Sequence, residues 1–167
     1  MAEKDTKFSS NIKYNGVLVF SEFYKFCHSW LLEELGLEIA EEKYAEKIEG
    51  DTKNIDIVWV CTKKLTDYFK FEMKVEFEIR KLAKIEITKG TAKIKADKGD
   101  IKVKVKGVLI RDYEGKFETN GFLKFLRAIY EKYVIPSRID QFEEKIIGDC
   151  DEFLNQGKAY LNLEGKK

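Results

Sequence analysis

Residues 68–80 read YFKFEMKVEFEIR, and this stretch decides the fold. Apolar side chains stand at every second position from Phe69 to Ile79, and charged side chains stand between them. A period of two is typical of a β-strand with one buried and one solvated face. Residues 101–106, IKVKVK, repeat the pattern. We therefore predict an antiparallel sheet whose charged face meets water and whose apolar face is covered by other elements.

The N-terminal part of the chain is expected to supply the first cover for this sheet. Residues 1–13 are polar and are expected to be flexible, and residues 16–20 (GVLVF) are expected to form a short apolar strand or a lead-in to the helix that follows. Residues 21–35 carry apolar side chains at helical spacing. Ser21 is a suitable N-cap and Gly36 a suitable stop, so we predict a helix between them that packs on the sheet.

Further strands are predicted on both sides of residues 68–80. Residues 37–48 are acidic and alternate weakly, which indicates an edge strand, whereas residues 55–62 (IDIVWVCT) are apolar on both sides and indicate a central strand. Residues 92–96 and 101–110 are expected to form a hairpin across the DKGD turn. Three consecutive apolar residues follow Gly107, which predicts a β-bulge at that glycine.

After the strands, the periodicity changes to that of helices. Asn120 is a candidate cap for a helix that ends before Pro136, the only proline. Ser137 begins a second helix, which the apolar spacing extends to about Leu163. One broad side of the first helix is apolar and consists of Phe122, Phe125, Leu126, Ile129, Tyr130 and Tyr133.

Together, these elements predict a single α+β domain over residues 1–167, with a curved antiparallel sheet covered on one face by an N-terminal helix and a long C-terminal helix. This layout resembles the helix-grip fold of the START/Bet v 1-like (SRPBCC) superfamily, in which a curved sheet closes around a long C-terminal helix. The resemblance covers most of the chain and lies in the order of elements, without a family motif. It implies a lipid carrier, a cyclase or a protein-binding module, because the fold alone does not select one function.

Composition excludes several classes of protein. The 167 residues have a formal net charge of only +1, which argues against general nucleic-acid binding. Cys27, Cys61 and Cys150 are far apart in the sequence, so we predict buried thiols in a reducing compartment and neither a disulfide framework nor a zinc site. The N-terminus has no apolar signal core, and no apolar run is long enough to span a bilayer. The expected location is the cytoplasm.

No motif in the sequence is sufficient by itself to indicate a catalytic activity. His28 is the only histidine and is adjacent to Cys27, but neighbouring helix residues do not face each other, so a Cys–His catalytic pair is disfavoured. We interpret the acidic residues Asp149, Asp151 and Glu152 as part of the solvent-exposed side of the long helix. We predict no catalytic residue, no metal site and no cofactor, and enzyme activity is disfavoured without being excluded.

Charge is distributed unevenly along the chain. Residues 33–49 hold seven glutamates and two lysines, whereas residues 89–106 hold seven lysines and two aspartates. These two surfaces suggest attraction to each other within the fold or between copies, docking of a protein partner, or an anionic partner on the basic side. The favoured alternative is simpler: lysines on an outer strand prevent sheet-to-sheet aggregation.

Two functions follow as expectations. The first is a non-catalytic helix-grip domain that binds a hydrophobic or amphiphilic small molecule, such as a fatty acid, between the sheet and the C-terminal helix. The second is a protein-interaction module without a small ligand, which docks through its charged sheet face or a helical face. Residues expected to contact the small molecule are Trp59, Phe71, Met73, Phe77, Arg111, Tyr130, Phe142, Ile146 and Phe153.

Overall fold

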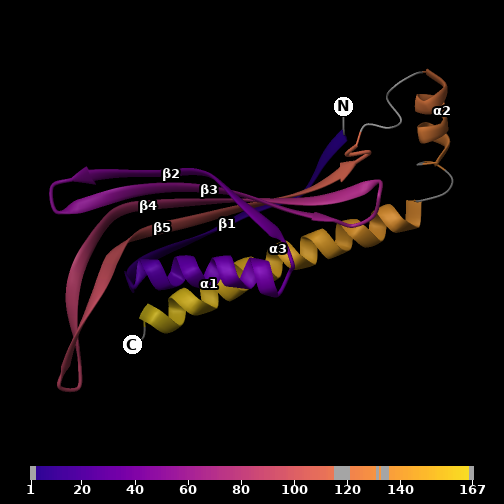
Figure 1. The fold of residues 1–167 in the computed structure, drawn as a ribbon. Coiled ribbons are helices and arrows are strands. Elements are labelled where there is room, and N and C mark those ends of the chain that lie inside the picture. Colours follow the sequence, from indigo (N-terminus) through magenta and orange to yellow (C-terminus); the bar gives the residue numbers. More distant parts are fainter. Residues whose placement is uncertain (1–2, 115–120, 131, 133–135, 166–167) are drawn as a thin grey trace.

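The computed structural model describes residues 3–114, 121–130, 132 and 136–165. Its strands are β1 (Glu3–Leu18), β2 (Glu38–Glu49), β3 (Thr52–Lys64), β4 (Phe69–Lys89) and β5 (Ala92–Arg111), and its helices are α1 (Phe20–Glu33), α2 (Gly121–Ile129) and α3 (Pro136–Gly165). The strands form one antiparallel sheet in the order β1-β5-β4-β3-β2. Helices α1 and α3 lie on the same side of the curved sheet, whereas α2 lies beyond one end of it (Figure 1). The predicted α+β class and the long C-terminal helix are confirmed.

The alternation in β4 separates the two faces of the sheet as predicted. Phe71, Met73, Val75 and Phe77 are at most 1% exposed and belong to one core cluster with α1 and α3. The charged side chains between them lie on the opposite face and remain at least partly exposed. The helix side of the sheet therefore holds the core, and the other side meets water.

Strand β4 is longer than the alternating stretch and bends partway along. The register with β5 shifts between Arg80 and Ala83, and Lys81 has a positive φ of 55°, which marks a β-bulge. Opposite the bulge, a Cβ on Gly99 would lie 3.1 Å from the carbonyl oxygen of Arg80, so only glycine fits without a shift. Beyond this point, the β4–β5 hairpin curves toward the side of the sheet that carries the helices (Figure 1).

The predicted hairpin between residues 92–96 and 101–110 is wrong. Residues Ala92–Arg111 form the single strand β5, which runs through the DKGD segment, and the chain turns instead at Gly90, whose φ is +61°. The DKGD segment stays extended because it pairs with β1 on one side and with β4 on the other. On the β1 side, Asp97 and Asp100 are in register with Leu18 and Asn15. The hydrogen-bonded pairing with two neighbouring strands therefore outweighs the local turn propensity of these residues.

The N-terminal segment is a strand and not a flexible tail from Glu3 onward, which corrects the expectation for residues 1–13. Strand β1 pairs along its whole length with β5, from Glu3 opposite Arg111 to Leu18 opposite Asp97. The predicted bulge at Gly107 is also misplaced, because the register shifts in the partner strand, between Thr6 and Phe8. Backbone pairing with a distant strand, rather than local composition, orders this segment.

Gly107 serves a different purpose from the predicted bulge. A Cβ at this position would lie 2.7 Å from Cys150 Sγ and 2.8 Å from Ile146 Cγ2, both of which belong to α3. The missing side chain thus lets α3 approach the backbone of β5 closely. Ile146, Cys150 and Phe153 are at most 2% exposed, so α3 contributes its apolar stripe to the core as predicted.

The other predicted elements are present with shifted ends. Strand β2 is an edge strand, as expected, and β3 lies inside the sheet between β2 and β4. Helix α1 begins one residue before the predicted cap, because Val19 is the N-cap and Ser21 lies within the first turn. Asn120 and Tyr133 lie outside the described residues. No helix in the described ranges is long and apolar enough to cross a membrane.

Candidate functional site

Six of the nine residues expected to bind a small molecule lie together in the core. They are at most 2% exposed and share one cluster: Trp59, Phe71, Met73, Phe77, Ile146 and Phe153. Their rings contact other rings directly, since Trp59 and Phe77 have centroids 4.8 Å apart and Trp30 and Phe153 have centroids 5.7 Å apart. These side chains fill the space between sheet and helices with one another, which is the packing of an ordinary core.

The remaining three expected residues lie toward the end of the sheet that α2 adjoins. Phe142 is half-buried, with its ring 5.2 Å from that of Phe69. Arg111 is directed to Asp5 on β1, where its Nη2 lies 2.7 Å from Asp5 Oδ2. This ion pair joins the ends of β1 and β5, so the guanidinium has a structural partner within the sheet.

A buried polar cluster attaches α2 to the sheet. The Arg127 side chain of α2 donates from Nε to the hydroxyl oxygen of Tyr68 at 3.0 Å, and its Nη1 lies 3.8 Å from Asp112 Oδ2. Asp112 and Arg127 are only 2% and 7% exposed. Asp112 also donates its backbone N–H to the Tyr68 carbonyl at 2.8 Å, from a left-handed conformation that aspartate tolerates. A buried ion pair and a buried hydrogen bond thus attach the Arg127 side of α2 to the end of the sheet.

The apolar side of α2 faces solvent as a consequence. Phe122 is 68% exposed, Phe125 60%, and Leu126 and Ile129 38% each, and we name these four residues the α2 face. Tyr130 continues it at 37% exposure and stacks edge-on against Tyr68, with centroids 5.7 Å apart. The sequence revealed the stripe but not its direction. The helix contains two charged residues, Lys124 and Arg127, and the sequence alone does not distinguish the exposed lysine from the buried arginine that fixes the direction of the stripe.

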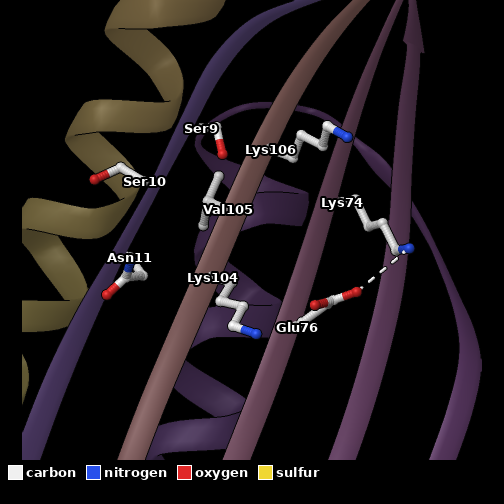
Figure 2. A pocket seen from close by; sticks show the side chains of 8 residues that line it. All are labelled: Ser9, Ser10, Asn11, Lys74, Glu76, Lys104, Val105 and Lys106. Carbon is white, nitrogen blue, oxygen red and sulfur yellow. Dashed lines mark ion pairs between the residues drawn. The ribbon is translucent and has the colours of Figure 1, made fainter.

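The face of the sheet opposite the helices is charged, and its charges largely pair with each other. A hollow of about 310 Å³ lies among β1, β5 and β4, and Figure 2 shows its side chains with α1 behind the strands. Lys74 Nζ lies 3.3 Å from Glu76 Oε1, and Lys104 Nζ donates to Glu78 Oε1 at 2.9 Å. That hydrogen bond raises the pKa of Lys104. The pairing leaves a mixed, solvated face rather than a concentrated cationic site.

The acidic and basic segments noted in the sequence do not meet in the described residues. Among the described residues, no ion pair joins 33–49 to 89–106, and β2 and β5 are separated in the sheet by β3 and β4. The explanation by edge protection also needs correction, because β1 covers residues 97–111 of β5. Only the part before Asp97, which includes Lys93 and Lys95, pairs on one side alone, with β4.

The structure gives no support to chemistry at the cysteines or the histidine. All three thiols are buried, and burial raises the pKa of Cys27, and raises those of Cys61 and Cys150 to about 12, so none is a nucleophile at neutral pH. His28 packs edge-on against Trp59 at 5.6 Å. Within the described residues, no group of three or more His, Cys, Asp or Glu side chains is placed to hold a metal ion.

Comparison with protein-family models, with curated proteins and with solved structures found no match to this chain. The class is therefore defined by the architecture alone. It is an α+β arrangement in which a five-stranded antiparallel sheet carries an N-terminal and a C-terminal helix on one face, a layout compatible with the helix-grip fold.

Proposed function

We propose that this chain is a protein-interaction module that inserts the α2 face into an apolar groove of a partner protein. The observation that carries the proposal is the spacing of the exposed side chains. Phe122, Phe125, Leu126 and Ile129 stand at i, i+3, i+4 and i+7, which is the anchor pattern of a helix that binds in a groove. Burial of each such side chain contributes about 1.5–3 kcal/mol.

The mounting of α2 supports this function. Arg127 is the only buried residue among the described positions of the helix, and it is fixed by Tyr68 and Asp112 at the end of the sheet. The helix is therefore held with its apolar side outward before any partner arrives. A preformed helix avoids much of the entropic cost that a disordered segment meets on binding.

The packing of the core favours this function over a ligand chamber between the sheet and α3. Ligand binding there requires the fully buried Phe71, Phe77 and Phe153 to separate, and each is in contact with the same core cluster. Opening a packed core creates a cavity that costs about 24 cal/mol per Å³. An exposed helix face requires no such rearrangement.

The proposal is tested by site-specific photocross-linking in the cells that produce the protein. A photoreactive amino acid replaces Phe125, and we expect a single protein adduct of defined mass. The matched control replaces Ile48, an apolar residue that is 74% exposed near the end of β2, and β2 ends at the opposite end of the sheet from α2 (Figure 1). An adduct from both positions with the same partner, or from neither, contradicts the proposal.

The partner identified by the adduct is then purified for titration calorimetry. We expect Phe125→Ala to weaken binding at least about tenfold, which corresponds to about 1.4 kcal/mol, whereas Ile48→Ala leaves the affinity unchanged. Two other occupants of the α2 face are distinguished by separate measurements. A homodimer that Phe125→Ala dissociates in sedimentation assigns the face to a second copy. Binding to lipid vesicles that the same change abolishes assigns it to a membrane. Either result overturns a partner protein.

A further inference from the structure

A recess of about 530 Å³ lies beside the beginning of α1, far from α2. It forms because the β2–β3 hairpin and the curved β4–β5 hairpin both extend past the first turn of the helix (Figure 1). Its apolar lining includes Phe20, Ile55 and Leu82, which are all buried in the core cluster. The volume is in the range typical of small-molecule sites, and the lining provides the apolar surface that such sites use.

Aromatic rings form the walls of this recess. Tyr24 is fixed, because its hydroxyl donates to Glu41 Oε1 at 2.7 Å and its ring lies edge-on to Trp59 at 5.1 Å. Tyr44 projects from β2 and is 50% exposed. One wall is thus preorganised and the other is open to solvent, so a flat apolar body can lie between them with little reorganisation.

The acidic groups of the recess already accept hydrogen bonds from the protein. Glu41 Oε1 accepts from Tyr24 and also from the Trp59 indole N–H at 3.2 Å. Asp97 Oδ2 accepts from the backbone N–H of Phe20 at 3.0 Å. Both carboxylates are therefore engaged in hydrogen bonds within the protein, and the polar groups that could bind a ligand are the basic ones.

Three lysines surround the recess, and two of them are available. Lys53 Nζ lies 2.8 Å from Glu46 Oε1 and is held by that ion pair. Lys25 on α1 and Lys84 on β4 are exposed, and no ion pair places either ammonium against a carboxylate within the described part of the chain. Two ammonium groups at the rim of an apolar recess favour a ligand with an anionic head.

We propose that this recess binds a small carboxylate with an aromatic or compact apolar body. The body lies between Tyr24 and Tyr44, and the carboxylate accepts hydrogen bonds from Lys25 and Lys84. The recess is separate from the α2 face, so a small ligand and a protein partner can occupy the chain together. This binding is additional to the proposed interaction function and does not depend on it.

The test uses naphthoate as the probe and naphthylmethanol as its uncharged counterpart, titrated into the full chain and followed by amide chemical shifts. We expect saturable shifts in the first turn of α1 and in β2 and β3 near Tyr44 and Ile55. Lys84→Gln should raise the Kd of naphthoate about five- to tenfold, the loss of one charge-assisted hydrogen bond, while naphthylmethanol binding changes little. Tyr44→Ala should weaken both probes.

Lys98→Gln is the matched control, because Lys98 is exposed on β5 next to Asp97 but does not line the recess. We expect it to leave the Kd of naphthoate unchanged, as should Phe125→Ala on α2. Equal weakening by Lys84→Gln and Lys98→Gln shows general attraction to positive charge and overturns the site. Shifts centred on α2, or no saturable binding, also overturn it, and neither result bears on the interaction between α2 and a protein partner.

Discussion

The carboxylate of Asp97, on β5, accepts a hydrogen bond from the backbone N–H of Phe20, the first residue of α1. Val19, the N-cap residue, offers no side-chain oxygen, and no side-chain cap hydrogen bond is present there. A residue from a distant strand thus provides the acceptor that serine, threonine or aspartate usually provides locally. The negative charge also lies at the end of the helix where the dipole stabilises it.

Removal of this distant cap should destabilise the whole fold. We expect Asp97→Ala to lower the free energy of unfolding by about 1–2 kcal/mol, because the Phe20 N–H is left buried without its acceptor. Urea denaturation followed by circular dichroism measures the change. Lys98→Ala, on the adjacent exposed residue, should stay within about 0.5 kcal/mol. Equal stability of the two variants would show that water replaces the carboxylate.

The alternation of β4 predicts opposite results for two adjacent positions. Phe77 is 1% exposed and has ring contacts with Phe23 and Trp59, so Phe77→Ala should cost about 3–5 kcal/mol. Glu76 lies on the charged face beside Lys74, and Glu76→Ala should cost no more than about 0.5 kcal/mol. Thermal unfolding of both variants gives the comparison, and similar losses in melting temperature would contradict the assignment of faces.

Substitution of two glycines by alanine should change the stability of the protein in opposite directions. Gly107→Ala places a methyl group against Cys150 and Ile146 and should destabilise by about 1–3 kcal/mol, as overpacked cores do. Gly148→Ala, in the middle of α3, meets nothing within 4 Å and should stabilise the helix by up to about 1 kcal/mol. Denaturant midpoints measure both changes. A neutral result at Gly107 would mean that α3 is not held tightly on β5.

The buried thiols should make stability depend on alkaline pH. Burial raises the pKa of Cys27, Cys61 and Cys150 above the ordinary value of 9.0, so the folded state keeps protons that the unfolded state loses. The free energy of unfolding should therefore be unaffected by these groups below about pH 8 and should fall above about pH 9, with a limiting slope near 1.4 kcal/mol per pH unit for each thiol. Denaturation at a series of pH values measures the slope.

Cys27→Ala provides the control for this dependence. The variant loses one of three thiols, so its alkaline slope should be smaller than that of the unmodified chain, although its stability at pH 7 is also lower. The thiol reagent dithionitrobenzoate should react slowly with the folded protein and rapidly with the unfolded one. An unchanged slope in the variant would assign the alkaline loss to lysine or tyrosine instead.

Local periodicity was sufficient to predict much of the sheet and helices. The strict alternation from Phe69 to Ile79 is decided by burial on one face of the sheet, and the apolar stripe of α3 is likewise decided by burial on one side of the helix. The wrong predictions, a flexible N-terminal segment and a turn at DKGD, share a cause, because the conformation of each segment depends on pairing with a distant part of the chain. The polar β1 is ordered by β5, and DKGD is kept extended by β1 and β4. Local propensity contains no signal for either pairing.

The candidate sites were harder to predict for a related reason. The apolar spacing predicted one apolar side of α2 but did not indicate whether that side packs inward or faces solvent. Its orientation is decided by Arg127 and Asp112, which meet only after the fold brings the end of β5 to α2. Likewise, the recess beside Phe20 depends on a bulge at Lys81 that curves the β4–β5 hairpin. The sequence shows which side chains are present at both candidate sites, but it does not show which of them the fold brings together.

The adjacency of β1 and β5 determines the order in which the nascent chain can fold. Of the five described strands, β1 leaves the ribosome first, but its partner β5 is made last, after α1, β2, β3 and β4. Strands β2, β3 and β4 can pair in the order of translation, whereas Phe8 and Ile12 have no sheet to join until β5 emerges. Closure of the sheet is thus a late, nonlocal step, which slows folding and leaves the β1 segment open to chaperones throughout synthesis.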